Sequence, residues 1–308
     1  MAYETAGDPI SGCKWTGKST EKIARELARA GCRVSPKTVA RLLKEMNFSL
    51  RVNVKMLESG QSKPIDPQIR DRQFRYIKRQ RLEYARKGLP IISVDTKARE
   101  LIGKSHHNGR RWSREPIDVF DHDFPSDADG VGIPYGIYDT VRNEGFVSIG
   151  ISRDTACFAV DAIRSWWTKA GSTHYRHADA ILILADCGGS NSYRARLWKY
   201  QLQIDFCNRS ELKVKVCHYP PGTSKWNPIE HRLFPFISAN WAAQPLVSYE
   251  AMLKRIRTTR TETGLRVRAL LNNKEYQTGI KVSDAQMQQI ALTPACIHPQ
   301  WNYSIAPS

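Results

Sequence analysis

The spacing of apolar residues predicts two short helices near the start of the chain. Between residues 19 and 30 apolar side chains recur at helical spacing, with Ser19 able to cap the start and Gly31 following the end. From Ser35 to Met46 the apolar positions repeat at i, i+3, i+4 and i+7, after a proline at the first helical position. Two short helices joined by a tight turn are typical of a helix-turn-helix.

The polar positions of the second helix are candidates for DNA contact. In a helix-turn-helix the early residues of this helix contact base edges and phosphates. The candidates here are Ser35, Lys37, Thr38, Arg41 and Lys44. An ordinary helical hairpin with solvated lysines is the alternative interpretation. A third, strongly basic helix is predicted over residues 68–87, where it either follows a phosphate path or serves as a solvated linker.

From residue 88 the pattern changes to strands alternating with helices. Helices are predicted over 154–170, with Asp154 as a cap, over 192–208, and from about Ile229-Glu230 onward. Strands are predicted over 89–96, twice within 133–152 around a turn near Arg142–Gly145, over 180–185 and over 212–219. Antiparallel strands first and alternating units afterwards predict an α/β fold with a mixed sheet flanked by helices.

The charge of the chain is positive and unevenly distributed. The 308 residues include 47 Lys+Arg against 30 Asp+Glu, a net charge of +17. Residues 1–90 hold 20 of the bases and 9 of the acids, or +11, which leaves 27 − 21 = +6 for residues 91–308. Such an excess attracts polyanions, of which nucleic acid is the commonest, although a basic but ordinary enzyme is the alternative on charge alone. We therefore expect a DNA-binding module over 1–65, a basic linker helix over 66–88 and a catalytic domain over 89–308.

Neither membrane insertion nor secretion is indicated by the sequence. The longest strictly aliphatic run, Ala180 to Ala185, is far shorter than the ~20 residues of a membrane-spanning helix, and no signal-peptide pattern is found at the start. The seven cysteines are odd in number and lack C-x-x-C spacing, which argues against a disulfide framework or a zinc knuckle. Scattered cysteines fit a reducing cytosol, so we expect a cytoplasmic protein.

Three carboxylates stand where a sheet of this kind binds its ligand. Asp95 and Asp186 each end a short apolar strand, and strand ends direct side chains into the ligand crevice. Glu230 begins a helix after the loop PPGTSKWNP. Taken singly, each acid is more often a turn or cap residue. Converging together, they would suit Mg²⁺, and two such ions can activate water or a 3′-hydroxyl and stabilise the leaving oxygen of a phosphodiester.

Four stretches of the catalytic part are distinctive: VDTKARELIG, PYGIYDTVRNEGFVSIGISRDTACFAV, ADCGGSNSYRARLW and CHYPPGTSKWNPIEHRLFPFISANW. They resemble transposases of the ISAzo13 family of bacterial insertion sequences. The loop PPGTSKWNPIEH is also similar to a signature of the wider IS630/Tc1/mariner group. The resemblance covers nearly the whole chain. It implies an RNase H-like fold behind a helix-turn-helix module, a DDE triad of Asp95, Asp186 and Glu230, and two Mg²⁺ or Mn²⁺ ions. It further implies cleavage and transfer of double-stranded DNA at terminal inverted repeats by a homo-oligomer associated with the bacterial nucleoid.

Two departures from the family support an alternative function. The opening MAYETAGDPISG is similar to the middle of a family member, and Cys187 stands where the family has glycine. The alternative is therefore a truncated or inactive remnant that acts only as a sequence-specific DNA-binding protein. A host nuclease of RNase H-like fold is a third, less supported, possibility.

Further residues close to the acids in sequence are candidates for binding DNA. Lys97 lies two positions beyond Asp95, hence on the same side of an extended chain, where it could contact a phosphate. Lys225, Trp226 and Asn227 could bind a nucleotide by charge, stacking and hydrogen bonding. For Trp226 and Asn227 a role in bracing the loop is an equal alternative.

Two histidines also lie near the acids. For His218 and His231 we expect supporting contacts behind the metal ligands rather than proton transfer, because a bound metal can generate the nucleophile itself.

Overall fold

The computed structural model describes residues 6–7, 14–15, 19–49 and 65–308 and divides the chain into two compact units, Met1–Met56 and Leu57–Ser308. In the first unit, β1 (Ala6–Gly7) pairs with β2 (Lys14–Trp15), and helices α1 (Thr20–Arg29) and α2 (Pro36–Glu45) form the predicted hairpin. Ser19 and Ser35 cap the two helices as expected, and Ile23, Ala24 and Val39 form a small core.

The basic helix is part of the second unit. Helix α3 (Pro67–Arg86) packs Tyr76, Ile77 and Tyr84 against the sheet. Its Gln73 is fully buried and donates from Nε2 to the backbone oxygen of His218 at 2.8 Å. The helix is therefore packed on one face and exposes its basic residues on the other, so the alternative of a solvated helix over residues 68–87 describes only the exposed face, and the linker bounds 66–88 stay a prediction.

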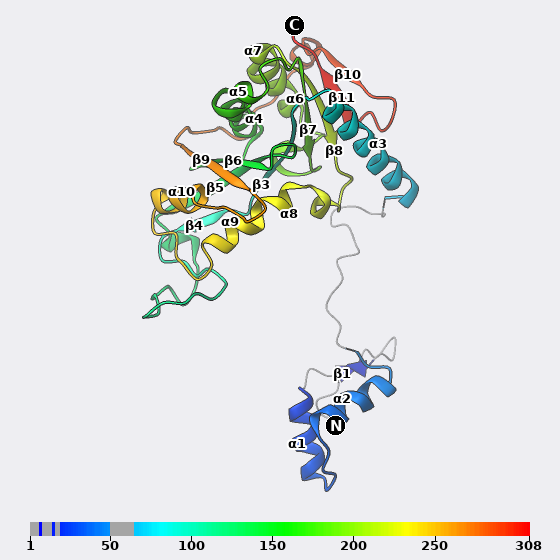
Figure 1. The fold of residues 1–308 in the computed structure, drawn as a ribbon, viewed down its shortest axis with the longest axis vertical. Helices are drawn as coiled ribbons and strands as arrows, with labels where there is room; N and C mark the ends of the chain where they lie inside the picture. Colours follow the sequence, from blue (N-terminus) through cyan, green and yellow to red (C-terminus); the bar gives the residue numbers. More distant parts are fainter. Residues whose placement is uncertain (1–5, 8–13, 16–18, 50–64) are drawn as a thin grey trace. The chain divides into compact units, whose positions relative to one another are not determined.

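The second unit is built on one mixed sheet of strand order β10-β11-β8-β7-β3-β5-β6-β9, with β4 added beside β5 (Figure 1). Strands β3, β6, β7 and β8 run in one direction and β5 runs against them. The central order β8-β7-β3-β5-β6 with this polarity is the RNase H-like arrangement, which confirms the expected fold class. The strands are β3 (Ile91–Thr96), β4 (Glu100–Ile102), β5 (Gly130–Asp139), β6 (Glu144–Gly150), β7 (Ala180–Ala185), β8 (Lys213–His218), β9 (Arg266–Asn272), β10 (Leu292–Pro294) and β11 (Asn302–Ile305).

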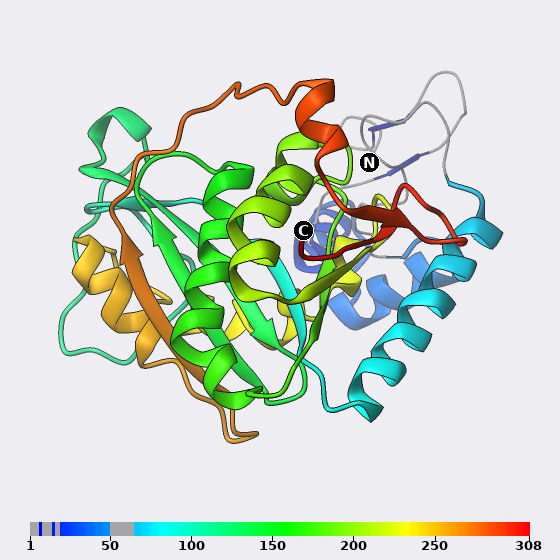
Figure 2. The ribbon, with the colours of Figure 1, turned by 90° about the horizontal axis from the view of Figure 1, so that it is seen from above.

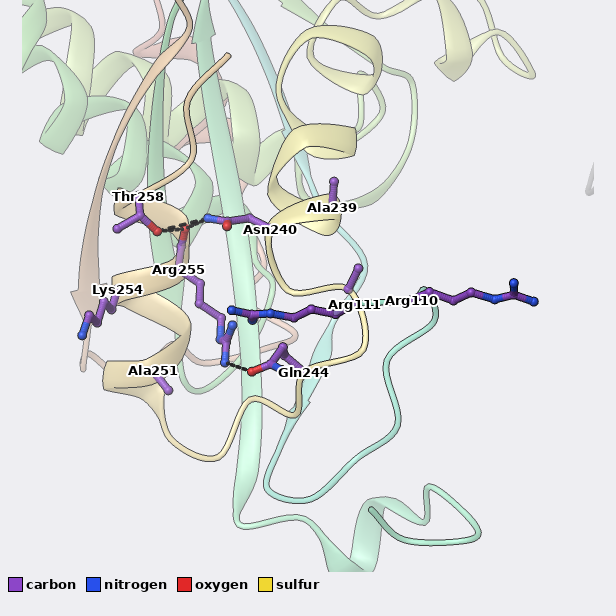
Figure 3. A pocket seen from close by; sticks show the side chains of 10 residues that line it. Arg110, Arg111, Ala239, Asn240, Gln244, Ala251, Lys254, Arg255 and Thr258 are labelled. Carbon is purple, nitrogen blue, oxygen red and sulfur yellow. Dashed lines mark hydrogen bonds between the residues drawn. The ribbon is translucent and has the colours of Figure 1, made fainter. Parts of the chain in front are cut away.

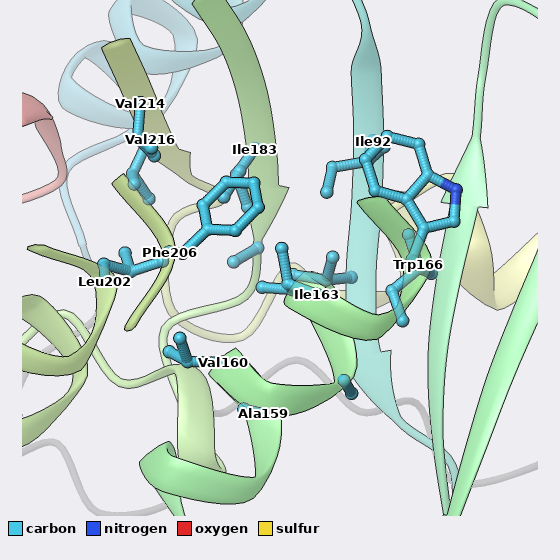
Figure 4. Packing of buried hydrophobic residues seen from close by; sticks show 14 of the residues in the cluster. Ile92, Ala159, Val160, Ile163, Trp166, Ile183, Leu202, Phe206, Val214 and Val216 are labelled. Atoms are coloured by element: carbon cyan, nitrogen blue, oxygen red, sulfur yellow. The ribbon is translucent and has the colours of Figure 1, made fainter. Parts of the chain in front are cut away.

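Helices cover both faces of the sheet (Figure 2). On one face α4, α6 and the π-helical turn that follows α6 pack against alternate residues of the central strands, as Ile92, Ile163 and Phe206 show (Figure 4). On the other face lie α3 and the helices α8, α9 and α10. The helices of the second unit after α3 are α4 (Ala156–Trp166), α5 (Ser172–His174), α6 (Arg196–Gln201), α7 (Asn208–Ser210), α8 (Ile229–Arg232), α9 (Phe234–Asn240), α10 (Tyr249–Arg257) and α11 (Asp284–Gln288).

Some elements differ from the sequence-based expectation. Thr155, not Asp154, caps α4, because the Thr155 hydroxyl accepts from the Phe158 amide. The helix expected over 192–208 begins at Arg196 and continues as a π-helical segment over Leu202–Cys207. The apolar pattern also did not predict α10 or the outer strands β9, β10 and β11. None of the helices that the structure describes has the length and apolar character needed to cross a bilayer.

Candidate active site

The register of two neighbouring strands brings Asp95 and Asp186 to one edge of the sheet. Strands β3 and β7 are parallel, and Val94 lies opposite Ala185. The next residue on each strand is an acid, so Asp95 and Asp186 leave the sheet side by side. Because side chains alternate along a strand, Asp95 points away from the face that buries Val94 and towards α8.

The start of helix α8 is fastened to strand β3 by buried hydrogen bonds. The Ser93 hydroxyl donates to Asn227 Oδ1 and accepts from the Ile229 amide at 3.0 Å. Asn227 Nδ2 donates to the Val94 carbonyl at 3.1 Å, and the Asn227 carbonyl accepts from the Glu230 amide at 3.0 Å. We name this set of contacts the Ser93–Asn227 latch. It holds Glu230 next to the strand that carries Asp95.

A glycine lets the helix approach closely. Gly136 lies opposite Asp95 in the β3–β5 register. A Cβ at this position would lie 2.6 Å from Phe234 Cε1 and 2.7 Å from Ile229 Cδ1. A larger residue would therefore force the Phe234 ring and the Ile229 side chain to shift, and with them the packing of α8 and α9 that holds Glu230.

Burial and electrostatic repulsion among the three acids shift the pKa values of two of them. Burial, and next the charge of Asp186, raise the pKa of Asp95 to about 9, and its carboxyl group is also in hydrogen-bonding contact with Glu230. Burial raises the pKa of Asp186 to about 6, with a further contribution from the charge of Glu230. Backbone amides oppose both shifts, since Thr96 N donates to Asp95 at 2.8 Å and Gly188 N to Asp186 at 3.3 Å. The structure thus brings the predicted triad together.

This negative charge is not balanced by any basic group that the structure describes. Among the described residues, none of the three acids forms an ion pair with a lysine, arginine or histidine. Within the same part of the chain, no group of three or more His, Cys, Asp or Glu side chains forms a preformed metal-binding site. The fit to a metal therefore rests on chemistry: crowded, half-buried carboxylates lacking a cationic partner are the oxygen donors that Mg²⁺ and Mn²⁺ prefer.

A fourth acid lies at the same edge of the sheet. Asp154 accepts a hydrogen bond from Thr96 Oγ1 at 3.2 Å, and its charge contributes to the raised pKa of Asp186. Strand β6 runs parallel to β3, so the chain leaving β6 at Gly150 emerges at the edge where Asp95 lies. The position of Asp154 shortly after a strand is therefore the sequence feature that marks it as a site residue. The prediction of Asp154 as a helix cap had assigned it a different role.

Two of the predicted DNA contacts are engaged inside the protein instead. The Lys97 side chain is 10% exposed, pairs with Glu100 and lies 4.7 Å from the centre of the Trp241 ring. Asn227 is 0% exposed, and both its Oδ1 and its Nδ2 form hydrogen bonds of the latch. The structure places Asn227 in the alternative role of bracing the loop, and it pairs Lys97 with Glu100, so contact of either residue with DNA stays a prediction.

Other predicted residues around the acids remain available or support the site. Trp226 is 58% exposed and lies edge-on to Phe74, with Lys225 Nζ 5.9 Å from its ring centre. His218 is buried, and its Nδ1 lies 2.7 Å from the backbone oxygen of Asp186. Burial lowers the pKa of His218 to about 4, so its ring is neutral at pH 7. His231 Nε2 contacts the backbone oxygen of Lys225.

The second helix of the N-terminal hairpin shows its polar residues to solvent. Lys37 and Lys44 are exposed, while Arg41 pairs with Glu45 at 2.8 Å. The hydroxyl of Ser35 accepts from the Thr38 amide at 3.1 Å and also lies 2.9 Å from the Thr38 hydroxyl. These contacts of Ser35 with Thr38 cap the N-terminus of α2. The hairpin itself is confirmed, and its contact with DNA stays a prediction.

Comparison with known proteins gives a family for the chain. The solved structures similar to it include a Mos1 transposase paired-end complex with left transposon end (15% identity, TM-score 0.45) and a Mos1 mariner paired-end complex with Mn (16% identity, TM-score 0.43). In both, 77% of this chain is covered, and this chain spans 65% of the other, just under two thirds. No curated protein matches the sequence. The profile of the family described as "Rhodopirellula transposase DDE domain" matches residues 1–307. The chain therefore belongs to the Rhodopirellula transposase DDE domain family.

Proposed function

We propose that this chain is a DDE transposase that cleaves DNA strands at the terminal inverted repeats of an insertion sequence and transfers them to target DNA. The observation that carries the proposal is the meeting of Asp95, Asp186 and Glu230, without a basic partner among the described residues, in a chain of a transposase family. Asp154 is added as a carboxylate at the rim of the same centre.

The roles of the residues follow from their positions. Asp95, Asp186 and Glu230 would hold one or two Mg²⁺ or Mn²⁺ ions, which supply activation of water or a 3′-hydroxyl and stabilisation of the leaving oxygen. Without a cation, the three acids repel the phosphate of the substrate. His218 holds the backbone of Asp186, and the Ser93–Asn227 latch holds Glu230.

DNA is the partner that the remaining exposed groups fit. Lys37 and Lys44 in the hairpin, and Lys225 with Trp226 beside the active site, offer charge and a stacking surface for nucleic acid. Cleaving and joining two element ends together requires two active sites, so we propose a homo-oligomer as the working form. The place of action would be the bacterial nucleoid in the cytoplasm.

The proposal is tested by nicking of a supercoiled plasmid that carries the element ends, with Mg²⁺ or Mn²⁺. Asp95→Asn, Asp186→Asn and Glu230→Gln should each slow nicking by roughly a thousandfold, because a metal contributes several kcal/mol to the transition state. DNA binding and circular dichroism should be retained. Glu262→Gln, which removes an exposed carboxylate elsewhere, is the matched control and should nick like the wild type.

Three results would contradict the assignment. Full nicking by any one triad variant would remove that residue from the catalytic centre. Sequence-specific binding with no nicking by the wild type in Mn²⁺ would identify a DNA-binding remnant instead. Cleavage without preference for the element ends would indicate a general nuclease.

A further inference from the structure

A basic cavity lies on the unit that carries the active site. It has a volume of 590 Å³ and is bounded by α9, α10 and the loop between β4 and β5 (Figure 3). Four basic residues line it, together with polar Gln244 and Thr258; the four are Arg110, Arg111, Lys254 and Arg255.

Among the residues that the structure describes, the positive charge in this cavity has no counterion. No carboxylate lines it, and in the described part of the chain none of the four basic residues forms an ion pair. The side chains of Arg111 and Arg255 extend towards one another (Figure 3). Burial, and then the charge of Arg111, lower the pKa of the Arg255 guanidinium. The protein therefore holds two like charges together in one hollow.

Neighbouring groups hold Arg255 in place. Arg255 Nη2 donates to Gln244 Oε1 at 2.9 Å. Its backbone carbonyl accepts from Asn240 Nδ2, which ties α10 to the end of α9. A guanidinium fixed in this way loses little rotamer freedom when it binds an anion.

We propose that Arg111 and Arg255 bind a backbone phosphate of the DNA strand that reaches the active site, an inference that rests on the proposed function. Paired guanidinium forks match the oxygen atoms of a phosphate. Helices α8 and α9 connect Glu230 to Asn240 at the cavity, a path of ten residues that spans about 15 Å at helical rise. At 3.4 Å per nucleotide of one strand, that distance corresponds to about four nucleotides.

The test is fluorescence anisotropy of a labelled double-stranded oligonucleotide, measured across a range of salt concentrations. Arg111→Gln should lower affinity about tenfold at low salt and reduce the slope of log affinity against log salt by about 0.9, the value of one neutralised phosphate. The matched control is Arg176→Gln, which removes the same charge before β7, at the opposite end of that strand from Asp186. An Arg111→Gln variant whose slope and affinity equal those of Arg176→Gln would overturn the inference.

A charge reversal separates lost binding from lost folding. Arg111→Glu would place a carboxylate opposite Arg255, so this variant should melt at a higher temperature than the wild type while binding DNA more weakly than Arg111→Gln. A variant that melts higher yet keeps wild-type affinity would contradict the proposal.

Plasmid nicking distinguishes this inference from the proposed function. Nicking by the wild type, combined with unchanged affinity of Arg111→Gln, would overturn the phosphate site and leave the transposase assignment standing. Loss of affinity in Arg111→Gln, combined with a wild type that never nicks with Mn²⁺, would support the phosphate site and remove the catalytic assignment.

Discussion

The acidic centre and the arginine cavity are two groups of like charges in one folded unit, and they differ in how that charge can be relieved. Asp95 and Asp186 are crowded and half-buried, and both pKa values are raised. Arg111 and Arg255 face one another across the cavity. A carboxylate can take up a proton and become neutral, whereas a guanidinium cannot lose one at any ordinary pH.

This difference teaches that the two sites depend on their ligands in different ways. Without a cation, the acidic centre lowers its own repulsion by holding protons, and a metal must displace them. The arginine cavity stays charged, so only an anion relieves it. Binding at the acidic centre should therefore depend on pH, and binding at the cavity should depend on salt.

Among changes that leave the three acids in place, the largest expected effect comes from loosening the acidic centre. Asn227→Ala removes the side chain of the Ser93–Asn227 latch, so we expect unfolding to become easier by about 2–3 kcal/mol through unpaired buried groups. Nicking, measured well below the melting temperature, should fall roughly 10- to 100-fold, because small misplacement of a reacting group is costly.

The control for the latch is an amide elsewhere in the unit. Asn208→Ala removes hydrogen bonds to Ser308 at the C-terminal end and should leave nicking unchanged. Wild-type nicking by Asn227→Ala would show that the latch does not position Glu230.

The next effect concerns the pH dependence of stability. Asp95 has a higher pKa in the folded chain than its ordinary 3.8, so between about pH 4 and about pH 9 the folded state binds more protons than the unfolded state. In the presence of a chelator, stability should fall as pH rises through this range. Asp95→Asn should flatten the fall and melt a few degrees higher near pH 8, a difference of about 1–2 kcal/mol.

A divalent cation should reverse the order of melting temperatures of the wild type and Asp95→Asn. Mn²⁺ should raise the melting temperature of the wild type and leave Asp95→Asn nearly unchanged, because only the wild type keeps the full set of carboxylates. Calorimetry with and without Mn²⁺ measures both values. A wild type whose stability does not respond to pH or to Mn²⁺ would argue against a repulsive metal centre.

A smaller effect is expected at the arginine cavity. Arg111→Glu replaces repulsion by attraction at a partly exposed site, so it should stabilise the fold by about 0.5–1 kcal/mol. The gain should be the same at pH 6 and pH 9, because neither guanidinium nor the new carboxylate titrates there. A gain that changes with pH like that of Asp95→Asn would erase the distinction between the two sites.

The smallest effect on stability is expected where charge is spread out. Lys37 is exposed on α2 of the hairpin, so Lys37→Gln should change stability by less than about 0.5 kcal/mol. It should nevertheless reduce the salt slope of DNA binding by about 0.9 if the hairpin contacts phosphate. An unchanged slope would assign the positive charge of the hairpin to solubility alone.

Much of the fold was predictable because local pattern and tertiary position agree. The run Ala180–Ala185 is a strand as predicted, since it is apolar on both sides and both faces of β7 are covered. The turn between β5 and β6 falls where the polar residues interrupt the apolar ones. The outer strands β9 and β11 were not predicted, because pairing with β6 and β8, distant in sequence, defines them as strands.

The site was predicted in its acids and less well in its surroundings. Asp95, Asp186 and Glu230 follow strand ends and a loop motif that the sequence displays. The burial of Lys97 under Trp241 and the use of Asn227 in the latch depend on residues more than 100 positions away, which no local pattern contains. Asp154 was missed for the same reason, since its nearness to Asp186 arises from the direction of β6.

The sequence by itself determined the positive charge of the first 90 residues, the central strands and helices, and the three acids as candidates, because these follow from residue type and spacing. Only the tertiary structure decided which charges are left without partners. Register placed Asp95 beside Asp186, and helix packing against Gly136 brought Glu230 to them. The packing of the loop between β4 and β5 against α9 and α10 gathered Arg111 and Arg255 into one cavity. Electrostatic energy depends on distance and burial, which exist only once the chain has folded.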